Sequence, residues 1–340
     1  MLIDLRSDTV TKPSPEMLEA MFTAEVGDDV FDEDPSVKKL EEKTAAIFGK
    51  EAGLFCPSGT MTNQVAIRIL TQSQQEIICD HLAHVYYYEG GGIAFNSGCS
   101  VRLLKGDRGR LNAKDIEENI NPDNIHHPVT AVVTLENTSN KGGGSYYSLQ
   151  NIKEIKEVCH RHQLKLHLDG ARIFNALEET KDAPSETGKY FDTISVCLSK
   201  GLGAPVGSVL LSSKENIRKA KRVRKVFGGG MRQAGFLAAA GIYALDHNIE
   251  RLKDDHKRAK IIGDEIKKLP FVEELFPVDT NIIVFKLSEN VKSEDFLKKL
   301  AQKNIKAVSF GKQLIRMVTH LDFNDDMLDE LVKTLGNYGN

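Results

Sequence analysis

The central part of the chain alternates between two kinds of hydrophobic pattern. Short, nearly continuous apolar runs lie at residues 76–79, 101–104, 131–135, 164–168 and 193–198. Between them, apolar residues recur every three or four positions, as at Val65, Ile69 and Leu70 and along residues 152–162. Buried strands give the first pattern and amphipathic helices the second. The alternation from about residue 50 to 210 therefore predicts an α/β fold with a mainly parallel sheet.

The two ends of the chain follow different patterns. Residues 1–30 are polar and mixed, and they read as an extended arm followed by a short helix with Ser14 as N-cap and Pro15 at its first position. Such an arm either packs on its own subunit or reaches a neighbour. Near residue 246 a long charged helix (248–269) begins, and strands at 281–287, 308–310 and 314–319 follow with helices at 296–302 and 325–335. We predict three units: an arm (1–30), a large domain (31–245) and a small C-terminal α+β domain (246–340).

Composition narrows the class of protein. The 340 residues carry a net charge of −3, which gives no electrostatic reason to expect a nucleic acid or a membrane as partner. The five cysteines form no CxxC motif and no zinc-type spacing with histidine, so we expect reduced thiols and no metal site. The first six residues are too charged for a signal peptide, and no apolar run approaches the roughly 20 residues of a spanning helix. A cytoplasmic protein is expected.

Candidate chemistry lies where predicted strands end. His84, Glu136, Asp169 and Lys200 all fall near such ends, and the carboxyl ends of parallel strands share one edge of a sheet. Lys200 follows the run 193–198 and is surrounded by small residues, a setting in which a lysine can form a Schiff base with a carbonyl cofactor. By itself, His84 is more often a core or surface histidine than a ligand.

A second candidate is the segment Pro57-Ser58-Gly59-Thr60, which precedes a predicted helix. Its free N–H groups and hydroxyls suit a phosphate, although a simple helix cap without a ligand has the same sequence. Together with Lys200, Asp169 and His84 it supplies what pyridoxal phosphate requires: a lysine for the aldehyde, a phosphate site, a carboxylate for the ring nitrogen and a stacking group. For the carboxylate of an amino acid substrate, Arg172 and Arg316 are candidates.

These residues occur in segments that resemble one family. The segments are IDLRSDTVTKP (3–13), PSGTMTNQ (57–64), AHVYYYE (83–89), HLDGARIFNA (167–176), CLSKGLGAPVGSVL (197–210), GGGMRQAG (228–235) and RMVTH (316–320). They are similar to those of low-specificity L-threonine aldolases, in order and over nearly the whole chain. The resemblance implies the pyridoxal-phosphate-dependent transferase fold (fold type I), and a dimer or tetramer with active sites at the dimer interface.

The resemblance also implies roles for individual residues. The cofactor would be held by Ser58, Gly59, Thr60, His84, Asp169, Arg172, Lys200 and Arg232. Ser7, Arg172 and Arg316 would bind the substrate carboxylate, and His126 would lie with His84 near the β-hydroxyl. Lys200, His84, His126 and Asp169 would be the catalytic set. Departures from the family pattern are Phe31, where tyrosine is common, and Ser139, where histidine is common.

The implied activity is that of an aldehyde-lyase. It would cleave L-threonine, L-allo-threonine and related 3-hydroxy amino acids to glycine and an aldehyde. The nearest alternative is another pyridoxal-phosphate lyase of this fold, either β-eliminating or of the phenylserine type. A binding module without catalysis is disfavoured because Lys200 and Asp169 are both present, and an NAD-binding fold because no GxGxxG follows an early strand.

Overall fold

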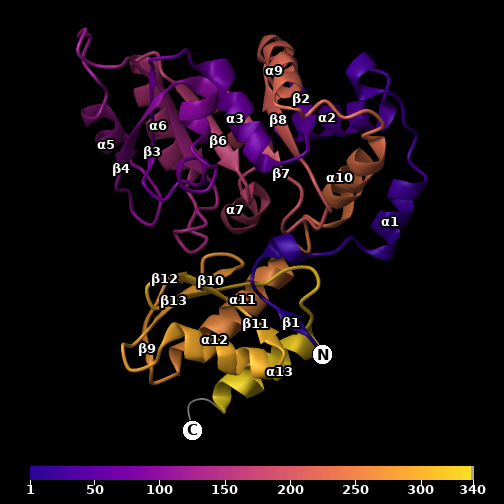
Figure 1. Ribbon diagram of the computed structural model, residues 1–340, viewed down its shortest axis with the longest axis vertical. Helices are drawn as coiled ribbons and strands as arrows, with labels where there is room; N and C mark the ends of the chain where they lie inside the picture. The colour runs from indigo at the N-terminus through magenta and orange to yellow at the C-terminus, as the bar shows by residue number, and fades with distance from the viewer. Residues whose placement is uncertain (338–340) are drawn as a thin grey trace.

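The main sheet has seven strands in the order β2-β8-β7-β6-β5-β3-β4. The computed structural model describes residues 1–337, and this sheet lies in the upper half of Figure 1. Its strands are β2 (Ala52–Cys56), β3 (Glu76–Asp80), β4 (Ser100–Leu104), β5 (Thr130–Glu136), β6 (Lys165–Gly170), β7 (Thr193–Cys197) and β8 (Ser208–Ser212). Pairing is parallel from β7 to β4, whereas β8 runs antiparallel to both β2 and β7. The prediction of a mainly parallel α/β sheet is confirmed, and the antiparallel β8 was not predicted.

Helices cover both faces of this sheet, as the alternation of side chains along its strands shows. On β8, Val209 and Leu211 pack into the core beneath α2, α6 and α10, while Leu210 packs under α3 and α9. Strands buried on both faces need a continuous apolar sequence, which explains the runs that predicted them. The large-domain helices are α1 (Pro15–Phe22), α2 (Pro35–Ile47), α3 (Gly59–Leu70), α4 (His84–Tyr87), α5 (Ala113–Glu118), α6 (Leu149–Arg161), α7 (Ile173–Thr180), α8 (Pro184–Gly188), α9 (Lys214–Val226) and α10 (Gly235–His247).

The start of α1 agrees with the cap residue read from the sequence, and α2 starts in the same way. Ser14 caps α1 by accepting a hydrogen bond from the Met17 amide, with Pro15 at the first helical position, and Asp34 caps α2 through the Val37 amide. A short polar side chain satisfies one of the free N–H groups at a helix start, so these positions could be located without a structure.

The small domain forms the lower half of Figure 1 around a second core. Its antiparallel sheet has the order β12-β13-β10-β9, and three helices pack on one face. The elements are α11 (Leu252–Lys267), β9 (Val272–Leu275), β10 (Ile282–Leu287), α12 (Ser293–Gln302), β11 (Ile305–Lys306), β12 (Val308–Gly311), β13 (Leu314–Val318) and α13 (Asp325–Gly336).

The N-terminal segment packs on this small domain. Strand β1 (Ile3–Asp4) pairs in parallel with β11, and Ile3 and Leu5 are buried in the second core. The 3₁₀ turn η1 (Asp8–Val10) then leads toward the large domain. Of the two possibilities left open for the arm, the chain therefore uses the first for residues 3–5: they pack on their own subunit.

Two further expectations can be compared with the structure. All five cysteines are free and buried. Within residues 1–337, every helix is too short or too polar to cross a bilayer.

Candidate active site

The carboxyl ends of β5, β6 and β7 bring the site together. Glu136 at the end of β5 pairs in register with Asp169 on β6, and Asp169 pairs with Ser195 on β7. Lys200 follows β7 by three residues. Three side chains from distant parts of the sequence therefore meet at one edge of the sheet, as strand order alone requires.

The turn that carries Lys200 lies against the N-terminal segment. The Gly203 amide donates a hydrogen bond of 2.8 Å to the Lys200 carbonyl, and Gly203 has φ of +77°, a conformation that favours glycine. A Cβ on Gly201 would lie 3.9 Å from Asp8 Oδ2. Asp8 is thus a close neighbour of the lysine, although 192 residues separate them in the sequence.

The first turn of α3 provides free N–H groups. Ser58 caps this helix, and its Oγ accepts a hydrogen bond of 3.1 Å from the Met61 amide. The amides of Gly59 and Thr60 have no acceptor among residues 1–337. Free amides and the helix dipole both favour an anion there. The turn opens into a groove of about 600 Å³ that also touches Gln64 and Phe227.

Asp169 is buried, and its two oxygens are held separately. Oδ1 accepts a hydrogen bond of 3.1 Å from the Ala171 amide, and Oδ2 accepts one of 3.0 Å from Asn63 Nδ2. Glu136 lies nearby, and burial together with the negative charge of Asp169 raises the pKa of Glu136 to about 7. A site with two buried carboxyls is electrostatically suited to a cationic group beside Asp169.

Asn63 has a fixed orientation because of its neighbours. Its Nδ2 donates to both Asp169 and Glu89 Oε1, and carboxylates can only accept. Its Oδ1 must then face His167, whose Nε2 lies 3.1 Å away and acts as donor. Burial lowers the pKa of His167 to about 4, so the ring is neutral, and its Nδ1 accepts from Thr193 Oγ1 at 2.8 Å.

His84 begins α4, and Glu89 orients its ring. The His84 Nδ1 lies 2.9 Å from Glu89 Oε1, while Gln64 Nε2 donates to the other Glu89 oxygen at 2.7 Å. Burial acts to lower the pKa of His84, but the hydrogen bond to Glu89 and the charge of Asp169 outweigh it, so the pKa is raised. With Nδ1 turned to Glu89, the lone pair of the neutral ring is on Nε2.

His84, Glu89 and Asp169 lie close enough together to be considered as metal ligands. Ligand atoms of His84, Glu89 and Asp169 lie within 4.8 Å of one another. Asn63 and Gln64 donate hydrogen bonds to the two carboxylates of this cluster, and Glu89 in turn binds the ring of His84.

Arg172 forms a buried ion pair with Asp8. Its Nε and Nη2 each donate a hydrogen bond of 2.7 Å to the Asp8 carboxylate. Burial acts to raise the pKa of Asp8, but the charges of Arg172 and Lys200 prevail and lower it. Two of the five N–H donors of Arg172 are thus used within the protein, and Nη1 has no acceptor among the described residues.

Arg316 and Ser7 lie on the small-domain side of the site. Arg316 on β13 donates to Asn140 Oδ1 and to the Arg6 carbonyl, at 2.7 and 2.9 Å. Burial and the nearby positive charge of Arg172 lower the pKa of Arg316 to about 10, so it is charged at neutral pH. Ser7 caps η1 and donates weakly to Asp8, at 3.5 Å.

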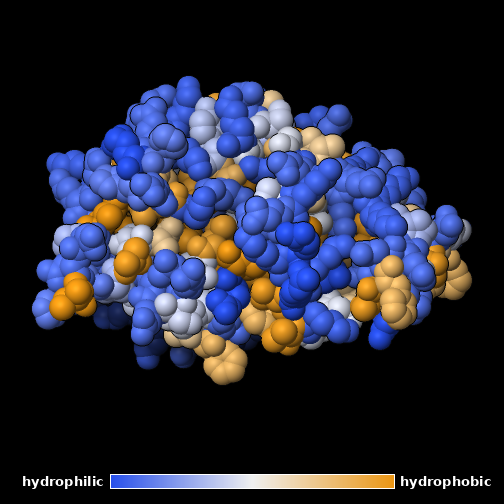
Figure 2. Space-filling view, turned by 90° about the horizontal axis from the view of Figure 1, so that it is seen from above, coloured by the Kyte–Doolittle hydropathy of each residue, from blue (hydrophilic) through white to orange (hydrophobic). Residues whose placement is uncertain are grey.

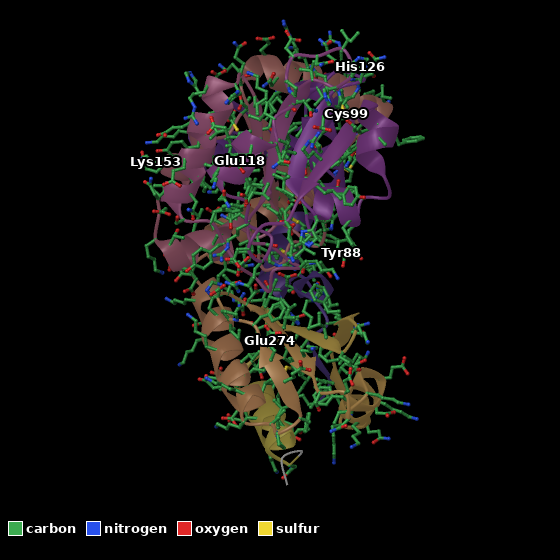
Figure 3. The ribbon with its side chains drawn as sticks, turned by 90° about the vertical axis from the view of Figure 1, so that its left-hand side faces the viewer. Tyr88, Cys99, Glu118, His126, Lys153 and Glu274 are labelled. Carbon is green, nitrogen blue, oxygen red and sulfur yellow. The ribbon has the colours of Figure 1, made fainter. Side chains whose placement is uncertain are left out.

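Two residues in the expected set lie apart from the others within one chain. His126 lies on an exposed loop before β5, at the opposite end of that strand from Glu136. In Figure 3 the label of His126 is far from that of Tyr88. Arg232 is exposed and pairs with Asp28 at 2.8 Å. Neither residue has a hydrogen bond or ion pair with another predicted site residue among residues 1–337, so a role for them at the Lys200 site stays a prediction.

Several residues of the site were missed by sequence reasoning. Asp8, Asn63, Glu89 and Asn140 each form a hydrogen bond with a predicted site residue, and His167 contacts Asn63. Glu136 was noted only for its position at a strand end. Polar residues within apolar stretches, such as His167 inside β6, were the one available signal. The pairing partners could not be read from the sequence, since Asp8 and Arg172 are 164 positions apart.

The donor set fits pyridoxal phosphate. The free amides of Gly59 and Thr60 suit its phosphate, and the fixed carboxylate of Asp169 suits a protonated ring nitrogen. Lys200 would carry the aldehyde, and His84 lies beside Asp169 through the shared Glu89–Asn63 hydrogen bonds. These groups converge at one sheet edge.

Comparison with known proteins decides the family. The sequence model of the beta-eliminating lyases matches residues 4–290. The chain belongs to the beta-eliminating lyase family. Members similar to it include the low specificity L-threonine aldolase of Escherichia coli K12, 40% identical over 333 residues with 97% of each chain covered. The low specificity L-threonine aldolase of Saccharomyces cerevisiae is 40% identical over 325 residues, covering 92% of this chain and 82% of the yeast protein.

Solved structures establish the same fold. The threonine aldolase of Leishmania major superposes with a TM-score of 0.86 at 20% identity, covering 99% of this chain and all of that one. The serine palmitoyltransferase of Sphingomonas wittichii has a TM-score of 0.77 at 15% identity, covering 99% of this chain and 87% of that one. The expected fold type I architecture is confirmed.

Proposed function

We propose that the protein is a pyridoxal-phosphate-dependent aldehyde-lyase that cleaves L-threonine, L-allo-threonine and related 3-hydroxy amino acids to glycine and an aldehyde. The observation that carries the proposal is the convergence of Lys200, Asp169 and the first turn of α3 with an arginine, Arg316, that forms no ion pair with a carboxylate among residues 1–337. The relatives named low specificity L-threonine aldolase, 40% identical along nearly the whole chain, support this activity.

When bound, the cofactor supplies an electron sink for the bond that breaks at the substrate α-carbon. The residues of this chain do the rest. Asp169 holds a proton on the ring nitrogen, and Ser58, Gly59 and Thr60 bind the phosphate through amides and hydroxyls. Arg316, with Ser7 and the free Nη1 of Arg172, fixes the substrate carboxylate and so determines which bond is aligned for cleavage.

The proton of the β-hydroxyl needs an acceptor. His84 is suited to this task because Glu89 binds its Nδ1, which leaves the Nε2 lone pair available when the ring is neutral. Glu89 is itself held by Asn63 and Gln64, so the imidazole has a defined orientation. His126 contributes only if another subunit brings it to this site.

We infer that two or four copies associate, with active sites shared between them. Phe95 and Val226 are 90% and 83% exposed, and both line the groove next to Ser58 and Thr60. Figure 2 shows apolar side chains at several places on the large-domain end of an otherwise hydrophilic surface. A second copy covering the groove would bury this apolar area and close the phosphate site. The five reduced thiols are consistent with a cytoplasmic location.

The test uses the purified protein with pyridoxal phosphate. Mixed with L-threonine, it should release glycine and acetaldehyde in equal amounts, and Lys200→Ala should lose both this activity and the visible absorbance of the lysine-bound cofactor. Release of pyruvate and ammonia from serine or cysteine without any glycine would instead identify a β-eliminating lyase. Cofactor bound without turnover of any 3-hydroxy amino acid would refute the proposal.

A further inference from the structure

The guanidinium of Arg316 is held in place without being neutralised. Its hydrogen-bond partners, the Asn140 side-chain carbonyl and the Arg6 backbone carbonyl, are uncharged acceptors, and its Cζ lies 4.6 Å from the centre of the Phe310 ring. Its third donor, Nε, is buried and has no partner among residues 1–337. Arg316 is half-buried, and a partly desolvated guanidinium without a counter-charge next to a cofactor site is suited to binding an anion from outside the chain.

The neighbouring arginine shows the contrasting arrangement. Arg172 is paired with Asp8 through two hydrogen bonds of 2.7 Å and is neutralised inside the protein. Both arginines lie close enough for the charge of Arg172 to lower the pKa of Arg316. The charged groups that influence Arg316 are Arg172 and Asp8, and of the two arginines only Arg172 forms an ion pair among the described residues.

Asn140 also connects to the opposite side of the site through its backbone. Its amide donates a hydrogen bond of 3.0 Å to Glu136 Oε1, and the other oxygen of Glu136 accepts one of 3.0 Å from the His84 amide. The side chain of Asn140 thus holds Arg316 of the small domain, while its main chain is tied to the start of α4 in the large domain. The two contacts are separable, because a substitution at position 140 changes only the first.

We propose that Asn140 is a specificity-determining positioning residue: its neutral amide oxygen orients Arg316 while leaving the full positive charge for a substrate carboxylate. An aspartate of nearly the same shape would orient Arg316 equally well but would neutralise it. The inference rests on the proposed function, since it takes an α-amino acid as the ligand. It assigns to Asn140 the preference of the enzyme for ligands with a free carboxylate.

The proposal predicts an unusual order of effects among variants. N140D should raise the dissociation constant of glycine by about tenfold or more, the scale of one charge-assisted hydrogen bond. N140A removes the same contact without adding charge, and Arg316 keeps the Arg6 carbonyl, so a change of about threefold or less is expected. A purely structural role for Asn140 would give the reverse order, because aspartate preserves the shape that alanine loses.

The experiment is a titration of the holoenzyme with glycine, followed through the visible absorbance of the bound cofactor. Glycinamide, which lacks the carboxylate, is the matched ligand, and N140D should bind it no more weakly than the wild type does. With threonine, N140D should raise KM more than it lowers kcat, because the backbone contact through Glu136 to His84 is unchanged. The unliganded absorbance spectrum of N140D should equal that of the wild type, which shows that the cofactor site is intact.

The outcomes separate this inference from the proposed function. If the wild type cleaves threonine and N140D binds glycine as the wild type does, the inference is overturned and the function stands. The inference is also overturned if N140A and N140D weaken the binding of glycine equally. It is overturned too if N140D weakens the binding of glycinamide as much as that of glycine. If the wild type cleaves no 3-hydroxy amino acid, the proposed function fails, while the comparison of glycine with glycinamide still tests the charge at Arg316.

Discussion

Glu136 should make the stability of the protein depend on pH near neutrality. Burial and the charge of Asp169 raise its pKa from an ordinary value of 4.5 to about 7. A raised pKa in the folded state means that the folded protein keeps a proton that the unfolded chain has lost. The resulting stability is complete below pH 4.5 and disappears as the pH rises through about 7.

The magnitude follows from the interval between the two pKa values. At about 1.4 kcal/mol per pH unit, the interval corresponds to a loss of about 3 kcal/mol between the acidic and the neutral side. Glu136→Gln removes this titration, but it lowers the free energy of unfolding by an amount that does not depend on pH. Its amide nitrogen cannot accept a hydrogen bond, so the amide of either His84 or Asn140 is left unpaired, at about 1–3 kcal/mol.

The wild type and the E136Q variant should therefore differ in how steeply the free energy of unfolding changes with pH. At pH 5 the E136Q variant should be less stable than the wild type, and by pH 8 the difference should have vanished or reversed. Urea unfolding of the cofactor-free protein across this range measures it, since the ring nitrogen would otherwise add a charge beside Asp169. Glu41, whose pKa burial also raises to about 7, provides a control: E41Q should flatten the pH profile in the same direction. A difference between wild type and E136Q that stays constant from pH 5 to 8 would contradict the reasoning.

Two further predictions concern the stability of the fold, one at the Asp8–Arg172 ion pair and one at two glycines with positive φ. Asp8→Asn leaves the buried Arg172 without its counter-charge and should destabilise the protein by about 3–5 kcal/mol, whereas Asp4→Asn, which breaks the exposed pair with Arg6, should cost less than about 1 kcal/mol. Because the pKa of Asp8 is lowered, the D8N difference should narrow only below the ordinary carboxyl pKa of 3.8, and equal unfolding midpoints for D8N and D4N at pH 7 would refute the argument. Gly207→Ala should be more destabilising than Gly228→Ala: both glycines have positive φ, but a Cβ at 207 would lie 2.5 Å from the Phe55 ring, whereas nothing lies within 4 Å of one at 228. We expect about 1–2 kcal/mol at position 228 and about 1–3 kcal/mol more at 207, measured by denaturant unfolding of both variants.

Patterns of neighbouring residues predicted many helices and strands of this structure. They could not predict which side chains far apart in the sequence would contact one another. Ser14 was identified as a helix cap, and a cap was one of two readings of the segment at Ser58, because a cap is a property of four adjacent residues. Asp169 and Lys200 were found because strand ends converge in a parallel sheet. The sequence carried no information on which carboxylate would pair with Arg172, or that Asn63 would lie between Asp169 and Glu89. His126 was placed near the site by family resemblance, which does not distinguish a residue of the same chain from one of a neighbour.

The pairing of β1 with β11 has a consequence for the order in which the protein is made and folds. Residues 3–5 are synthesised about 300 residues before their strand partner at Ile305–Lys306 and before most of the core that buries them. The small domain therefore contains contacts of high sequence separation and cannot be completed until β11 has been made. The upper domain, whose strands all lie between residues 52 and 212, can assemble earlier. Because Asp8 follows directly after this late-pairing strand, the counter-charge of Arg172 reaches its final position among the last contacts to form.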